Sequence, residues 1–119
     1  MEMDMEKNNG VDFRFSEDTS EAVFSIRGEL DHHSVKEIRE AIDEKLIIHR
    51  PKKVVFNLSG VTFTDSAGLG LILGRYTRIT GYKGELRLVE TPNEFMKILR
   101  LAGADRMFKI EEKRKGNEQ

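Results

Sequence analysis

The 119-residue sequence contains no cysteine and no tryptophan, and only two of its residues are proline. Without cysteine, the chain cannot form a disulfide scaffold, a thiolate zinc site or a cysteine nucleophile. The lack of cysteine also fits a reducing compartment. We therefore expect a cytoplasmic protein.

A net excess of charge is missing too, because 20 basic and 21 acidic residues leave a net charge of −1. A protein that holds nucleic acid through its phosphates is usually basic, so we expect no direct contact with nucleic acid. No unbroken apolar run is longer than a triplet such as Leu71–Leu73. A membrane-spanning helix needs about 20 apolar residues, and we therefore expect no contact with a membrane.

The sequence does contain one ordinary domain between two polar ends. A length of 119 residues fits one domain, since domains typically contain about 100–150 residues. Residues 1–10 include four charged side chains, and residues 111–119 include six. Such polar segments cannot bury a core. We expect a folded domain over residues 11–110, a disordered N-terminal end over 1–10 and a polar C-terminal tail over 111–119.

Apolar residues recur with the period of strands in some segments and of helices in others. Strands are predicted at residues 11–15, 22–27, 53–58, 84–89 and 107–110. Helices are predicted from about residue 34 to a stop before Pro51, at 66–80, and between Pro92 and Gly103. Ser34 and Glu37 have the spacing of a capping box at the start of the first helix.

The element order β-β-α-β-α-β-α-β predicts an α/β fold. Strands that alternate with helices imply right-handed crossovers and a mixed, mostly parallel sheet. The first two strands are close enough in sequence to form a hairpin, which makes the first strand antiparallel. The strand at 53–58 is almost continuously apolar, so we expect it at the centre of the sheet, covered on both faces.

The segment FTDSAGLG at residues 63–70 follows that central strand and leads into a helix. Open α/β sheets form their sites at this carboxyl edge. Asp65 is a good N-cap, because its carboxylate can accept from free N–H groups of the first turn, and Ser66 then takes the first helical position. Three glycines between residues 68 and 74 each cost roughly 1 kcal/mol in a helix. We expect a close approach of this helix to the sheet or to another protein.

Two interpretations of Ser66 stay open on these residues alone. Asp65 and Ser66 can be capping groups only, as serine and aspartate at helix starts commonly are, or Ser66 can be a site of modification or binding. Enzyme motifs do not fit: a nucleophile elbow needs Gly-x-Ser-x-Gly, and a phosphate-binding loop needs Gly-Lys-Ser/Thr after a glycine and four residues. The glycines also lie too far inside the helix for a dinucleotide site.

The histidines do not predict a metal site. His32 and His33 are adjacent, and successive helical residues point about 100° apart, which makes them a poor pair of ligands. His49 lies at the far end of the same predicted helix. The basic run at residues 113–115 is flanked by acids and is typical of a solvated end. We expect neither a metal nor a cofactor.

Three stretches, GELDHH at 28–33, VVFNL at 54–58 and FTDSAGLGLILGRY at 63–76, are similar to those of a known family. They resemble the STAS domain, the fold shared by sulfate-transporter tails and bacterial anti-sigma factor antagonists. Within that family, the sequence is most similar to the antagonists that act in sporulation. The resemblance covers roughly residues 11–110.

This resemblance implies a regulatory role without catalysis. In the family, the first serine after the aspartate is phosphorylated by the anti-sigma factor, which is also an ATP-dependent serine kinase, and the matching residue here is Ser66. The unphosphorylated chain would bind the anti-sigma factor and release the sigma factor. A metal-dependent serine phosphatase of the type-2C class would then restore this form.

The resemblance also implies a partner-binding surface built from the loop at Asp31 and the start of the Ser66 helix. The residues expected there are Asp31, His32, His33, Thr64, Asp65, Ser66, Ala67, Gly68, Leu69 and Arg75. Many family members have a second serine where this chain has Ala67, which leaves Ser66 as the only serine of the motif. The alternatives are a STAS interaction module or scaffold outside sigma-factor control, and a small nucleotide-binding protein or enzyme.

Overall fold

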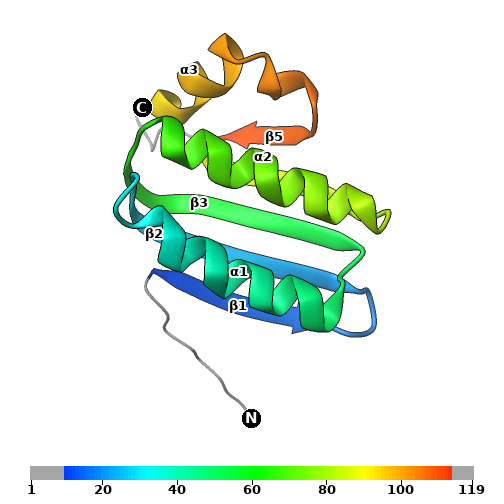
Figure 1. The fold of residues 1–119 in the computed structure, drawn as a ribbon. Helices are drawn as coiled ribbons and strands as arrows, with labels where there is room; N and C mark the ends of the chain where they lie inside the picture. The colour runs from blue at the N-terminus through cyan, green and yellow to red at the C-terminus, as the bar shows by residue number, and fades with distance from the viewer. Residues whose placement is uncertain (1–9, 114–119) are drawn as a thin grey trace, which may run out of the picture.

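The computed structural model describes residues 10–113, and within them it contains five strands, three α-helices and one short 3-10 helix (Figure 1). The strands are β1 (Val11–Ser16), β2 (Glu21–Leu30), β3 (Lys53–Thr64), β4 (Glu85–Thr91) and β5 (Lys109–Glu112). The helices are α1 (Val35–His49), α2 (Ser66–Gly81), α3 (Asn93–Leu101) and the 3-10 helix η1 (Ala104–Arg106).

The strands form one sheet in the order β1-β2-β3-β4-β5. β1 pairs antiparallel with β2, and every other neighbouring pair is parallel. The predicted α/β fold with a mixed, mostly parallel sheet is therefore confirmed. The parallel arrangement gathers the ends of β2 and β3, and the helix starts that follow them, at one edge, which we call the carboxyl edge.

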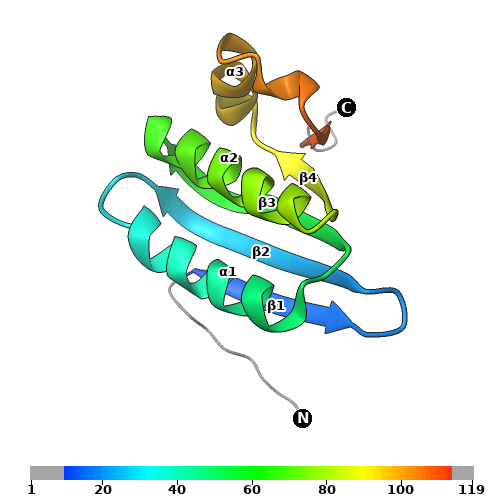
Figure 2. The same cartoon turned by 45° about the vertical axis from the view of Figure 1, so that its right-hand side comes forward.

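Helices α1 and α2 lie side by side across one face of the sheet, and α3 lies beyond α2 on the side of the molecule away from β1 (Figures 1 and 2). Strand β2 shows the matching alternation, because Ala22, Phe24 and Ile26 are buried while Arg27 is exposed. The expectation that the strand at 53–58 is covered on both faces agrees with its burial, because Val54 and Phe56, which alternate with Val55, are at most 1% exposed. Val55 is only 7% exposed, between Val23 and Arg87 of the neighbouring strands.

The core is made by the apolar stripes that helical spacing predicts. Ile38, Ile42 and Leu46 of α1 are buried, as are Ile72 and Ile79 of α2. They pack against the buried side of the sheet, where the rings of Phe24 and Phe56 meet edge to face at 5.6 Å. Burial of these side chains fixes both helices, and therefore both helix starts, against the sheet.

Both central strands continue beyond their predicted ends. β2 and β3 remain paired through Leu30 and Thr64, with irregularities between Ser25 and Arg27 and between Gly28 and Glu29. Bulges of this kind let a strand continue past polar, turn-like residues. At Gly60 an added Cβ would lie 2.8 Å from the Cβ of Arg27, so the close approach of the two strands requires glycine there.

The chain ends depart from the prediction by a few residues. The last strand is Lys109–Glu112 instead of 107–110, so two residues of the predicted polar tail belong to the sheet. The other predictions for the ends concern residues 1–9 and 114–119, which lie outside the described residues. Within residues 10–113, no helix combines the length and the apolar composition needed to cross a bilayer.

Candidate functional site

Two loops meet at the carboxyl edge, and they contain most of the residues predicted to bind a partner. The pairing of Leu30 with Thr64 places the ends of β2 and β3 side by side. One step further, the backbone N–H of Asp65 donates to the carbonyl of Leu30 over 3.2 Å. This bond fixes the segment 31–34 next to the start of α2.

Asp31 organises the first loop. Its Oδ1 accepts from the backbone N–H groups of His33 and Ser34, both at 3.0 Å, and lies 3.1 Å from the Ser34 hydroxyl. That hydroxyl donates to the carbonyl of Glu29 over 2.5 Å. Ser34 is the N-cap of α1 without a side-chain capping bond, so the predicted capping box with Glu37 is wrong.

These bonds also determine the charge of Asp31. Its pKa lies below the ordinary value, because the backbone N–H of Ser34 stabilises the carboxylate most, and the Ser34 hydroxyl and His33 add to that effect against a smaller opposing effect of desolvation. The carboxylate is therefore ionised at neutral pH. The negative charge of Asp31 is stabilised by donors of its own turn.

Asp65 and Ser66 form the start of α2 as predicted. Asp65 has an extended conformation, and its Oδ1 accepts from the Ala67 N–H over 2.7 Å, which is the expected N-cap. The Gly68 N–H donates to the Asp65 carbonyl over 3.0 Å. Ser66 is exposed, whereas Thr64, Asp65 and Ala67 are half-buried. Its side chain is accessible to another protein.

The three glycines of α2 have different surroundings. A Cβ on Gly68 would overlap Thr64 Oγ1 and lie 3.3 Å from Leu30 Cβ, so any larger residue would press against the two strand ends that the helix touches. Nothing lies within 4 Å of a Cβ built on Gly70 or Gly74. Close approach to the sheet is confirmed for Gly68 and wrong for the other two.

Alanine substitution should separate these positions. Gly68→Ala should lower the free energy of unfolding by about 1–3 kcal/mol, because the added methyl overpacks the contact with Thr64 and Leu30. Gly70→Ala should raise it by up to ~1 kcal/mol, because alanine favours the helix and meets no neighbour. Urea unfolding of both variants checks this, and equal effects of the same sign would contradict it.

His32 and His33 are exposed at the outer side of the Asp31 loop, with ring centroids 4.2 Å apart. Leu69, by contrast, is half-buried and packs against the core. Within residues 10–113, no three His, Asp or Glu residues gather in an arrangement that could hold a metal ion. The histidine pair adds exposed aromatic surface beside Asp31.

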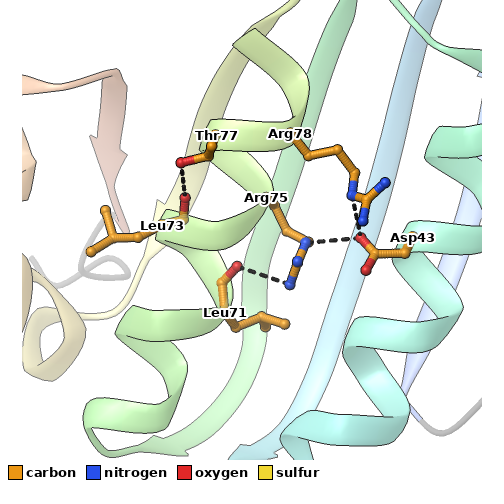
Figure 3. A network of polar contacts seen from close by, with 6 residues as sticks. All are labelled: Asp43, Leu71, Leu73, Arg75, Thr77 and Arg78. Atoms are coloured by element: carbon orange, nitrogen blue, oxygen red, sulfur yellow. Dashed lines mark hydrogen bonds and ion pairs between the residues drawn. The ribbon is translucent and has the colours of Figure 1, made fainter. Parts of the chain in front are cut away.

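Arg75 does not belong to this surface. Its side chain is 8% exposed, and its Nε lies 2.9 Å from Oδ1 of Asp43 in α1, while Nη1 donates to the Leu71 carbonyl over 3.4 Å (Figure 3). Arg78 Nε approaches the same carboxylate oxygen at 3.3 Å. A partner cannot reach a guanidinium held between two helices, so the structure does not support the prediction that Arg75 contacts one.

The sequence pattern predicts neither the ion pair of Asp43 nor the exposure of Phe63. Asp43 looks like one more charged residue on a helix, and its pairing depends on how α1 lies against α2. Phe63 is half-exposed, at 52%, although aromatic residues in strands are usually counted with the core. Its place directly before Thr64–Ser66 is the only signal that the sequence offers.

Comparison with known proteins gives consistent relatives. The family model described as the STAS domain matches residues 3–116. A protein of Paenibacillus polymyxa named anti-sigma F factor antagonist is 31% identical over 110 residues, which cover 92% of this chain and 83% of that protein. A protein of Lysinibacillus sphaericus with the same name is 33% identical over 81 residues, covering 68% of this chain and 69% of that protein.

A solved structure is similar to the fold as a whole. The Bacillus cell fate determinant SpoIIAA in its phosphorylated form superposes with a TM-score of 0.67 at 25% sequence identity, covering 84% of this chain and 89% of that one. The five-stranded mixed sheet and its helices are thus shared with that protein.

Proposed function

The chain belongs to the STAS domain family, and from this premise we propose that it is an anti-sigma factor antagonist controlled by phosphorylation of Ser66. In its unphosphorylated form it binds an anti-sigma factor that is also a serine kinase, and a sigma factor is released. A type-2C serine phosphatase reverses the modification. The protein acts in the cytoplasm as a ligand and kinase substrate.

The observation that carries this proposal is the position of Ser66. It is an exposed serine at the first position of α2, on an edge where the backbone holds two loops together. The names of the two relatives support an anti-sigma factor as the partner. The phosphorylated form of the solved relative supports phosphorylation as the control.

The local geometry determines what a phosphate would do there. Asp65 already occupies the N–H groups of Ala67 and Gly68, through its carboxylate and its carbonyl. A phosphate on Ser66 adds about −1.5 to −2 charges at pH 7, and few free donors of the first turn remain for it. The favourable helix dipole, worth about 0.3–1 kcal/mol, is opposed by the Asp65 charge. The phosphate therefore alters the surface and leaves the fold in place.

Phosphorylation with the anti-sigma factor kinase tests the proposal. The wild-type chain, incubated with ATP and the anti-sigma F factor encoded in the same genome, should gain one phosphate, and Ser66→Ala should gain none. Intact-mass spectrometry and peptide mapping give the number and the position of the phosphates. Ser59→Ala is the control, since it removes another exposed serine hydroxyl of β3 outside the predicted partner-binding residues and should still be phosphorylated.

Two results would contradict the proposal. A phosphate on both the wild type and Ser66→Ala would place the modification elsewhere. No phosphate on either protein, together with no binding to the anti-sigma factor, would favour a STAS interaction module outside sigma-factor control.

A further inference from the structure

Five large apolar side chains are more than 40% exposed within residues 10–113, and only one of them lies at the carboxyl edge. They are Ile47, Ile48, Phe63, Leu101 and Met107. The two isoleucines belong to the last turn of α1, Leu101 ends α3, and Met107 follows η1. Since the helices run back from the carboxyl edge, the ends of α1 and α3 lie at the opposite edge. Phe63 alone shares the edge of Ser66.

Phe63 is the second-last residue of β3. It pairs with Glu29 across the parallel ladder, immediately before the Leu30–Thr64 pair. Only two residues separate it from Ser66, so their Cα atoms lie at most about 11 Å apart, the length of three extended peptide units. An interface that covers Ser66 therefore reaches Phe63.

Beyond Asn57, β3 has no paired strand on its β4 side among residues 10–113, and Lys113 Nζ donates to the Ser59 carbonyl over 3.1 Å. The ladder between β3 and β4 ends at the pair Asn57–Val89, whereas β3 continues to Thr64. Among the described residues, its final part has a strand only on the β2 side. Thr62 is exposed like Phe63. Beyond Ser59, a partner can approach this part of the strand without displacing another strand among the described residues.

The acidic groups of the same edge need no help from a partner. Asp31 accepts from its own turn, and Asp65 accepts from the first turn of α2. The ring of Phe63, by contrast, is half-exposed to solvent in the free protein, which is unfavourable for an apolar group. Aromatic side chains at the centre of interfaces carry much of the binding energy, and burial of this ring removes apolar area from water.

We propose that Phe63 is the apolar anchor of the interface and inserts into an apolar pocket of the anti-sigma factor beside Ser66. This inference rests on the proposed function and deepens it. An anchored ring excludes water from its neighbourhood, and Ser66 lies within that neighbourhood. The anchor thereby makes the interface sensitive to the Ser66 phosphate, because a dianion next to a buried ring loses its hydration.

Binding of three variants tests the anchor. The probe is the anti-sigma F factor encoded in the same genome, and isothermal titration calorimetry gives Kd. Phe63→Ala should raise Kd about thirtyfold or more, as hot-spot aromatic residues do. Phe63→Leu keeps an apolar side chain and should bind within about tenfold of the wild type. Leu101→Ala, at a residue that is 89% exposed, is the matched control and should change Kd less than about threefold.

The outcomes separate this inference from the proposed function. If the wild type binds, loses binding on Ser66 phosphorylation, and Phe63→Ala binds equally well, the anchor is wrong and the proposed function stands. If Leu101→Ala weakens binding as much as Phe63→Ala, the contact is not centred on this edge and the anchor is wrong. If the wild type does not bind the anti-sigma factor, both proposals fall. Thermal melts of Phe63→Ala should stay within a few degrees of the wild type, since its ring is half-exposed in the free protein.

Discussion

Phosphorylation of Ser66 should weaken binding to the anti-sigma factor at least a hundredfold and leave the melting temperature within a few degrees of the unmodified value. Bringing a dianion against a partner removes its water, which costs several kcal/mol unless the charge is paired. A penalty of about 3 kcal/mol already corresponds to more than a hundredfold in Kd. Within the free protein, the helix N-terminus attracts the Ser66 phosphate and the Asp65 carboxylate repels it, and the two effects roughly offset each other.

The measurement compares Kd and thermal melts for the unmodified and the enzymatically phosphorylated protein. Ser66→Asp supplies part of the charge and should lose binding in the same direction, whereas Ser66→Ala should bind like the unmodified chain. A fall of the melting temperature by ten degrees or more in the phosphorylated form would show that Ser66 is a structural capping position, and the switch would then act through the fold.

Asp43→Ala should lower the free energy of unfolding by about 3 kcal/mol, because it leaves the guanidinium of Arg75 unpaired between α1 and α2. The side chains of Arg75 and Asp43 are only 8% and 19% exposed, and burial already lowers the pKa of Arg75, with Asp43 opposing that shift. Since the Asp43 side chain is partly exposed to solvent, we expect a loss of stability at the low end of the ~3–5 kcal/mol typical of a broken buried pair. The corresponding fall in Tm is roughly 10–15 °C for a domain of this size.

An exposed ion pair of the same chain provides the control. Arg27 and Asp12 lie 3.2 Å apart with side chains 44% and 50% exposed, and Asp12→Ala should change stability by less than about 1 kcal/mol. The double variant Asp43→Leu/Arg75→Met removes both charges and should recover most of the loss. Urea unfolding measures all of them. A loss below about 1 kcal/mol for Asp43→Ala would mean that water already compensates the charge of Arg75, since Arg78 bears the same charge and cannot.

The order of the elements could be predicted because each has a strong local pattern. The stripe of α1 and the alternation of β2 are properties of adjacent residues, and they are present in the structure. The ends of β2 and β3 could not be predicted, since their continuation depends on bulges that form only when the two strands pair. Gly60 looks like the end of a strand in the sequence and is the point where two strands approach closely.

The candidate site divides in the same way. Asp65 as N-cap follows from its position before an apolar helical repeat, and the structure contains that cap. The turn of Asp31 and Ser34 cannot be told from a capping box in the sequence, because both use the same residue types. For Arg75, only the family resemblance predicts a place on the partner-binding surface. Its true neighbour is on another helix, and the sequence contains no information on which helix faces which.

The bond from the Asp65 N–H to the Leu30 carbonyl has a consequence for how specificity can change. It ties the two loops together through main-chain atoms, so the frame does not depend on the exposed side chains that surround it. His32, His33 and Thr62 can be exchanged without moving Ser66. Chains that share this frame can therefore present different exposed side chains at the carboxyl edge, through substitutions that leave folding stability unchanged.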